Sequence, residues 1–181
     1  YKSSPEYQLI NYGMSLGEFK VIFWWEYFHR LLGRLIGLVF FIPFAYFLFT
    51  RRLNSNLVAR LLGIFALGGL QGGMGWYMVA SGLVDDPNVS QYRLTAHLSI
   101  AFLIFGAITW TALTVLYPSK ANLNTPAKKM YKFSIAINLL LLIMVVSGGF
   151  VAGLRAGLIY NTFPLMGNSF IPPDLFALSP W

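Results

Sequence analysis

Four long apolar stretches dominate this sequence and leave few folds open to it: residues 29–49, 61–83, 94–116 and 133–154. Each is close to the roughly 20 apolar residues that a helix needs to cross a bilayer. The connections between them are short and carry turn-forming residues, so successive helices should run antiparallel to one another. We therefore predict an all-α fold, a polytopic transmembrane helix bundle with four spans.

The composition excludes several other classes of protein. Hydrophobic residues make up 57% of the chain, charged residues make up only 10%, and cysteine is absent. A disordered chain, a disulfide scaffold and a thiolate metal site are therefore excluded. The net charge of +7 does not indicate a nucleic-acid partner, because the basic residues separate apolar runs instead of lining one face of a soluble domain. The expected partner of the surface is the lipid bilayer.

The charges of the connecting segments predict the orientation in the membrane. The connections after the first and third stretches hold seven basic residues and no acid: Arg51, Arg52, Arg60, Lys120, Lys128, Lys129 and Lys132. The six acids lie in the other segments or at their membrane edge: Glu6, Glu18, Glu26, Asp85, Asp86 and Asp174. By the positive-inside rule, the two basic connections face the cytoplasm or the matrix. The N-terminal segment and the tail then face the other side.

The first 28 residues do not form a span of their own. Ser15 and Glu18 have the spacing of a capping box, and an apolar and aromatic run follows them. We expect the first long helix to begin near Leu16 and to continue for about 34 residues, which at about 1.5 Å per residue exceeds the thickness of the hydrocarbon core. Its outer turns carry Trp24 and Trp25, which suit the aromatic belt at the interface.

Small residues recur at helical spacing in three of the stretches. They are Gly33 and Gly37, then Gly68, Gly69, Gly72, Gly73 and Gly75, and finally Gly149, Gly153 and Gly157. Helices pack closely in lipid through such faces. Packing alone is one interpretation. The other is that glycines thin the helices to admit a bulky flat ligand.

Two histidines, His29 and His97, are the main candidates for metal ligands. They lie about one turn inside the outer boundary, on two spans that run in the same direction, so their imidazoles should meet at one depth. Two histidines without cysteine do not complete a zinc site, but they can hold the iron of a planar macrocycle on its two sides. We therefore favour axial ligation of haem iron over two hydrogen-bonded packing histidines.

Charged residues surround this pair. Arg93 lies one turn before His97, Arg30 follows His29 directly, and Arg34 lies one turn deeper. Arginine binds carboxylates through two parallel hydrogen bonds, so these side chains suit haem propionates. Interfacial arginines that extend to lipid headgroups are the alternative for Arg30 and Arg93.

Glu26 shares one helix face with His29 and Arg30 because it precedes them by three and four residues. A plain salt bridge to Arg30 is one interpretation. The other is a catalytic carboxylate at a haem edge, which moves a proton or stabilises positive charge.

Four segments together resemble the haem A synthase family of membrane proteins, also called Cox15/CtaA. Residues 26–34 (EYFHRLLGR) resemble its Glu-x-x-His-Arg-x-x-Gly-Arg signature, and residues 93–98 (RLTAHL) are similar to its second histidine motif. Residues 70–83 (LQGGMGWYMVASGL) resemble the span between them, and residues 147–167 resemble the family's fifth span and the loop that follows. The resemblance covers nearly the whole chain.

The resemblance implies a protein of eight spans in two similar halves, each with a histidine pair. It implies oxidation of a ring methyl of haem O to a formyl group, which makes haem A for cytochrome oxidase. His29 and His97 would be the pair of the first half and Glu26 the essential acid, while a haem b cofactor would belong to the second half. The chain would cover roughly spans two to five and should be inactive alone. The competing function is a bis-histidine membrane electron carrier of the cytochrome b type.

On this basis we expect five segments. Residues 1–28 form an outer-face segment with the interfacial start of the first helix, and residues 29–116 form three spans of the first haem-binding half. Residues 117–132 form an inner basic loop, residues 133–154 open the second half, and residues 155–181 form a cut outer-face loop. The expected partners are haem O, haem O synthase and an electron-transfer protein, with a homo-oligomer left open. The expected location is the bacterial cytoplasmic membrane or the mitochondrial inner membrane.

Overall fold

The computed structural model describes residues 1–82, 89–118, 125–159, 161–162 and 164–171. These contain helices α1 (Pro5–Leu9), α2 (Leu16–Phe49), α3 (Ser55–Gly82), α4 (Gln91–Leu116) and α5 (Thr125–Gly153), followed by a 3-10 turn at Ala156–Leu158. Within these ranges β-structure is limited to one isolated bridge, Met166–Ser169. Helices α2 to α5 are each long and apolar enough to cross a membrane. The predicted all-α fold with four spans is confirmed.

Helix α2 begins where its capping box predicts. Ser15 Oγ accepts a hydrogen bond from the Glu18 backbone N–H at 3.3 Å, and a Glu18 carboxylate oxygen accepts one from the Ser15 N–H at 2.8 Å. The helix then runs for 34 residues to Phe49, with Pro43 inside it. At about 1.5 Å per residue its length is roughly 50 Å, well above the ~30 Å of a hydrocarbon core. Its outer turns carry contacting aromatic rings, such as the stacked pair Trp24 and Phe28.

Two helices extend beyond the apolar stretches that predict them. Helix α3 begins at Ser55 because Asn54 Oδ1 accepts a hydrogen bond from the Leu57 N–H at 2.8 Å, which caps the first turn. Helix α5 begins at Thr125, so the segment predicted as a basic loop, 117–132, is helical from that residue onward. Lys120, Asp85, Asp86 and Asp174 lie outside the described residues. The connections are therefore shorter than hydropathy alone indicates.

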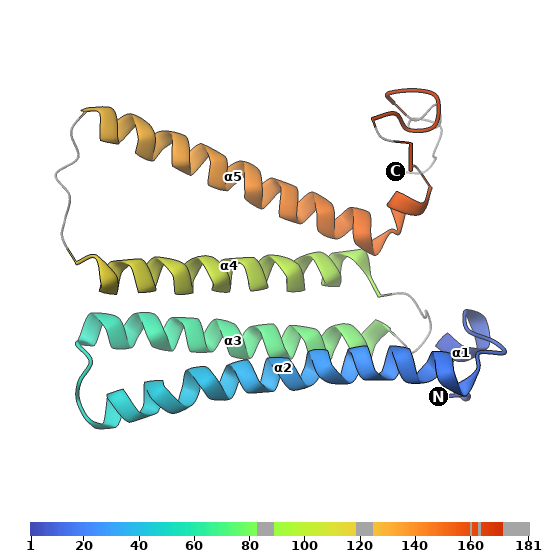
Figure 1. The fold of residues 1–181 in the computed structure, drawn as a ribbon, viewed down its shortest axis with the longest axis horizontal. Helices are drawn as coiled ribbons and strands as arrows, with labels where there is room; N and C mark the ends of the chain where they lie inside the picture. Colours follow the sequence, from blue (N-terminus) through green and yellow to red (C-terminus); the bar gives the residue numbers. More distant parts are fainter. Residues whose placement is uncertain (83–88, 119–124, 160, 163, 172–181) are drawn as a thin grey trace.

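The long helices pack in the order of the sequence. Helix α2 contacts α3, α3 contacts α4, and α4 contacts α5, and in the described ranges no other pair of long helices comes together. Figure 1 shows that neighbours run antiparallel and that α5 diverges from α4 away from their common outer end. This is an open arrangement in which α2 and α5 do not meet.

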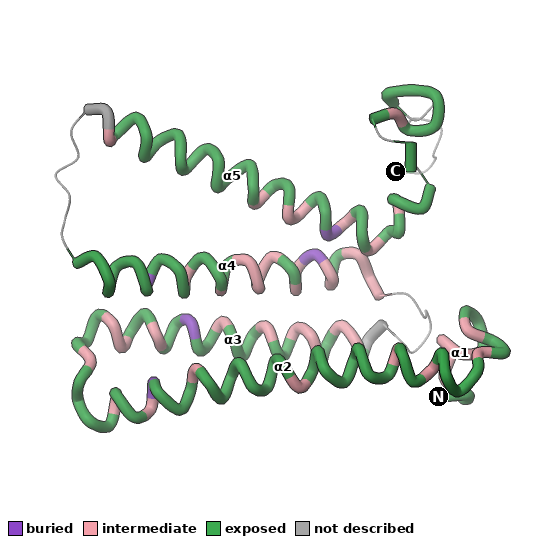
Figure 2. Tube along the Cα trace, in the orientation of Figure 1, coloured by how far each residue is buried: buried purple, intermediate pink, exposed green. Residues whose placement is uncertain are grey.

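Burial is correspondingly sparse. Only Phe44, Ile64, Thr95, Thr111 and Gly149 are buried among the described residues. Figure 2 shows the half-buried positions concentrated on α3 and on the N-terminal half of α4. Large apolar side chains such as Trp76 and Phe105 are 73% and 67% exposed. A chain surrounded by lipid loses little by exposing apolar side chains, since lipid tails are as apolar as they are.

The glycines divide into two groups. A Cβ on Gly149 would lie 2.9 Å from Thr95 Cα, and one on Gly153 would lie 2.6 Å from Gln91 Cα, so both let α5 approach α4 closely. By contrast, a Cβ would meet no described atom within 4 Å at Gly33, Gly37, Gly68, Gly69, Gly72, Gly73, Gly148 or Gly157. The packing interpretation is thus confirmed at the α4–α5 crossing, and the glycine pairs of α2 and α3 face no neighbour within the described part of the chain.

Candidate functional site

His97 lies near the outer end of α4 and is half-buried against α3. Its Nε2 is 3.2 Å from the amide nitrogen of Gln71. Its Cε1 lies 3.1 Å from the place where a Cβ of residue 75 would be, so the ring occupies space that only glycine leaves free. Gln71 and Gly75 are four residues apart and therefore share one face of α3. The side chain of His97 is held by this face.

Three buried polar atoms of α3 and α4 have no hydrogen-bond partner among the described residues. They are His97 Nδ1, Gln71 Oε1 and Thr95 Oγ1. Nearly all buried polar groups in proteins are paired, so such atoms mark a place where a further group binds or where a side chain turns on binding. The atoms of His97 and Gln71 belong to one contact between α3 and α4, whereas Thr95 Oγ1 faces Gly149 of α5. An imidazole is a ligand that fits the iron of a haem.

His29 lies on α2 with an exposed side chain. The two histidines are 68 residues apart in the sequence, yet they lie at the same end of the molecule (Figure 1), on helices that do not contact each other within the described ranges. Figure 1 shows why: the N-terminal parts of α2 and α4 lie at the same end of the molecule. The fold therefore places both predicted ligands near the same end of the molecule, with the His97 ring turned toward α3.

Glu26 and Arg30 form an ion pair along α2. Arg30 Nη2 donates a hydrogen bond to Glu26 Oε2 at 2.8 Å, and the two side chains are 55% and 54% exposed. The spacing of four residues is the one that allows this contact on a helix. Only one carboxylate oxygen is used, so the other keeps its lone pairs for a further partner.

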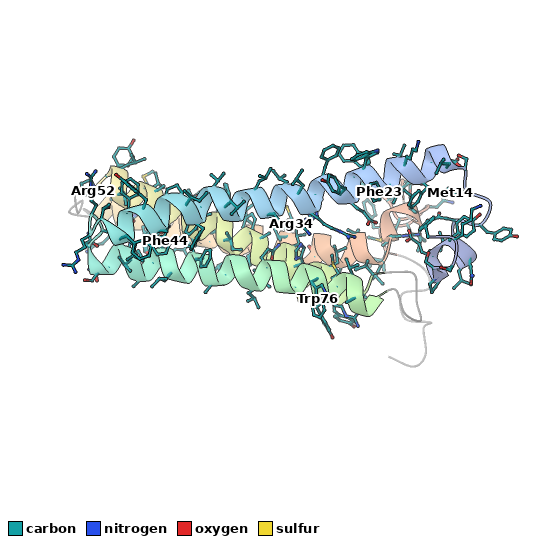
Figure 3. All side chains as sticks on the ribbon, turned by 90° about the horizontal axis from the view of Figure 1, so that it is seen from below. Met14, Phe23, Arg34, Phe44, Arg52 and Trp76 are labelled. Atoms are coloured by element: carbon teal, nitrogen blue, oxygen red, sulfur yellow. The ribbon has the colours of Figure 1, made fainter. Side chains whose placement is uncertain are left out.

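The two remaining arginines have different surroundings. The guanidinium of Arg93 lies 5.1 Å from the centre of the Tyr77 ring, a cation–π contact that joins α4 to α3. Arg34 lies midway along α2 (Figure 3), exposed and without a hydrogen bond or ion pair inside the described ranges. A lone cation at this depth of a span is costly, so Arg34 has the environment of a residue that binds an anionic ligand.

Gln71 and Gly75 are the contacts of His97 that sequence reasoning did not assign. Gln71 is the single amide side chain in the stretch 61–83, and an amide inside an apolar span needs a partner. Gly75 was one of many glycines, and its place opposite the imidazole depends on how α3 is rotated. Of these two contacts of His97, only Gln71 could have been identified from the sequence.

Comparisons with known proteins identify the family of this chain. The model of the COX15-CtaA family, described as "Cytochrome oxidase assembly protein", matches residues 1–181. The chain is 61% identical to the heme A synthase of Nitrosospira multiformis, covering 100% of this chain and 51% of that protein. It is 57% identical to the heme A synthase of Nitrosomonas eutropha, again covering 100% of this chain and 51% of the relative.

The chain thus spans about half the length of the curated relatives that it matches. No solved structure matches it. Because the family model matches every residue, this chain belongs to the COX15-CtaA family of cytochrome oxidase assembly proteins.

Proposed function

We propose that this chain is part of a haem A synthase, an oxidoreductase that converts a ring methyl of haem O to a formyl group and so makes haem A for cytochrome oxidase. The observation that carries the proposal is the similarity of the entire chain to proteins named heme A synthase, at 61% identity to one of them. The positions of His29 and His97 at the same end of α2 and α4 (Figure 1) support the proposal, because two histidines could hold a haem iron from its two sides.

In this proposal each charged residue has a role toward the substrate haem O. His29 and His97 hold its iron, which supplies the redox chemistry when bound. Arg30, Arg34 and Arg93 bind and orient it through its propionates. Arg34 supports this role because nothing in the described part of the protein neutralises it. Arg93 supports it because its contact with Tyr77 leaves guanidinium N–H groups free for a carboxylate.

Glu26 is the proposed catalytic residue. Oxidation of a methyl group releases protons from the reacting carbon, and an ionised carboxylate nearby can accept one. Arg30 donates its hydrogen bond to Oε2, and Oε1 has no hydrogen bond among the described residues. Glu26 precedes His29 by one turn on the outer side, which places it at the periphery of a ligand held by the histidine and not on its axis.

The remaining parts of the proposal concern the whole protein. Residues 29–116 form most of the first haem-binding half, 133–154 open the second, and a haem b cofactor binds in that second half. Haem O synthase delivers the substrate, and a separate electron-transfer partner completes the oxidation. The protein lies in the bacterial cytoplasmic membrane or the mitochondrial inner membrane, with its basic connections inside. Four spans agree with a multi-pass membrane protein.

Extracted haem tests the proposal. Cells that express the full-length protein and make haem O should accumulate haem A, identified by mass, and the double change His29→Ala and His97→Ala should abolish this. A cytochrome b-type electron carrier would instead return its haem unmodified. Unmodified haem from a folded, haem-loaded protein would therefore contradict the enzymatic function and favour the carrier.

A further inference from the structure

The contact between Gln71 and His97 defines which ring nitrogen of His97 has a lone pair that could bind a metal ion. The amide nitrogen of Gln71 has hydrogens and no acceptor lone pair, so at 3.2 Å it donates to His97 Nε2. A ring nitrogen that accepts is unprotonated, and the proton of the neutral imidazole is then on Nδ1. The lone pair of Nε2 is the group that a metal ion would bind.

The other edge of the ring is closed by α3. Nδ1 is buried and without a partner, and Cε1 lies against the space above Gly75. A ligand as large as a porphyrin cannot reach Nδ1 in this position. Iron ligation by His97 therefore has to use Nε2, the nitrogen that the Gln71 amide already occupies.

We infer that Gln71 is a positioning residue that competes with haem iron for Nε2 of His97. This rests on the proposed function, since it deepens the role of His97 as an axial ligand. In the ligand-free protein, the amide orients the ring and fixes its tautomer. For Nε2 to hold haem iron, the amide would have to be displaced and the ring would turn away from Gln71 and Gly75. The affinity of the site for haem is then lower than it would be if no amide occupied Nε2 of His97.

The expected effect is modest because one hydrogen bond is exchanged. Net contributions of such bonds in proteins correspond to a factor of roughly 3 to 10 in an equilibrium constant. Gln71→Leu keeps the size of the side chain and removes both its donor and its acceptor. It should therefore bind ferric protohaem about threefold to tenfold more tightly than the unmodified protein.

The matched control is Asn138→Leu on α5. It also replaces an amide on a long apolar helix by leucine, but within the described part of the protein Asn138 donates only to the Ser134 carbonyl of its own helix, at 2.8 Å. Both variants are made in the full-length protein, purified without the substrate haem and titrated with ferric protohaem. His97→Ala supplies the baseline for haem bound elsewhere. Asn138→Leu should titrate like the unmodified protein.

A spectroscopic measurement makes the test independent of haem. Nitrogen-15 NMR of histidine-labelled, ligand-free protein should show Nε2 of His97 as a hydrogen-bonded acceptor and Nδ1 as protonated, and Gln71→Leu should remove the hydrogen-bonding shift of Nε2. Equal or weaker haem binding by a folded Gln71→Leu protein would overturn the inference. So would a protonated Nε2 in the unmodified protein, which decides the case even if the variant does not fold. If His97→Ala leaves haem binding unchanged, the proposed function fails instead.

Discussion

Gly149→Ala tests whether α4 and α5 are held at the separation that the structure shows. The added Cβ would lie 2.7 Å from Thr95 Oγ1 and 2.9 Å from Thr95 Cα. Carbon atoms pack at about 3.5–4.0 Å, so a backbone contact at this distance forces the helices roughly 1 Å apart. A side-chain rotation cannot relieve it, because the Cα of Thr95 belongs to the helix itself.

The cost follows from overpacking, which typically destabilises a protein by about 1–3 kcal/mol. Gly148→Ala is the matched control, since its Cβ meets no described atom within 4 Å. Alanine is the better helix former by about 1 kcal/mol, so the control should be neutral or slightly stabilising. The two substitutions, at adjacent glycines on one helix, are therefore expected to change the stability of the protein in opposite directions.

The assay is unfolding of the full-length protein in mixed micelles by increasing sodium dodecyl sulfate, followed by loss of helical circular dichroism. Gly149→Ala should lower the midpoint relative to both the unmodified protein and Gly148→Ala. If the two variants unfold at the same midpoint, α5 does not approach α4 through Gly149. The reasoning about the α4–α5 crossing would then be refuted.

Three further predictions concern the site and the orientation. Glu26→Gln should retain bound haem and lose haem A formation, because it removes the charge of the side chain and keeps its shape. A normal rate of haem A formation, measured by haem extraction, would contradict the catalytic role and leave the salt bridge to Arg30 as the role of Glu26. Gly75→Ala should tighten binding of ferric protohaem several-fold, since its Cβ would press from 3.1 Å on the imidazole in the ligand-free position that the ring leaves on binding, whereas Gly72→Ala should titrate normally because no described atom lies within 4 Å of its Cβ. Reporters fused at Asn54 and at Asn122, the latter outside the described residues, should both report the cytoplasm or matrix, and a split result would contradict the charge argument.

The helices were predictable because their signals are local. The capping box of Ser15 and Glu18 specifies the start of α2 by hydrogen bonds within four residues, and hydropathy specifies the four spans. Hydropathy did not predict that α3 and α5 begin before residues 61 and 133, because the first turns of both helices are polar and lie outside the apolar stretches. A cap such as Asn54 extends a helix without any change in hydropathy.

The site was only partly predictable because it depends on helix rotation. Sequence spacing correctly gave the ion pair of Glu26 with Arg30, which lies on one helix. It could not say which glycines face a neighbour: Gly75 meets an imidazole while Gly72, one turn away, meets nothing in the described part. Contacts between helices depend on where each helix presents its face, and nothing within one stretch encodes the rotation of the next.

The order of helix contacts has a consequence for how this part of the protein is made. Each long helix contacts the one before it and the one after it, and the described ranges contain no contact between long helices that skips a neighbour. Loops between sequential helices are short, so little chain entropy is lost when two of them meet. Each span can therefore pack on its predecessor as soon as it leaves the translocon, and the α2–α3–α4–α5 series assembles in the order of synthesis without waiting for a distant segment.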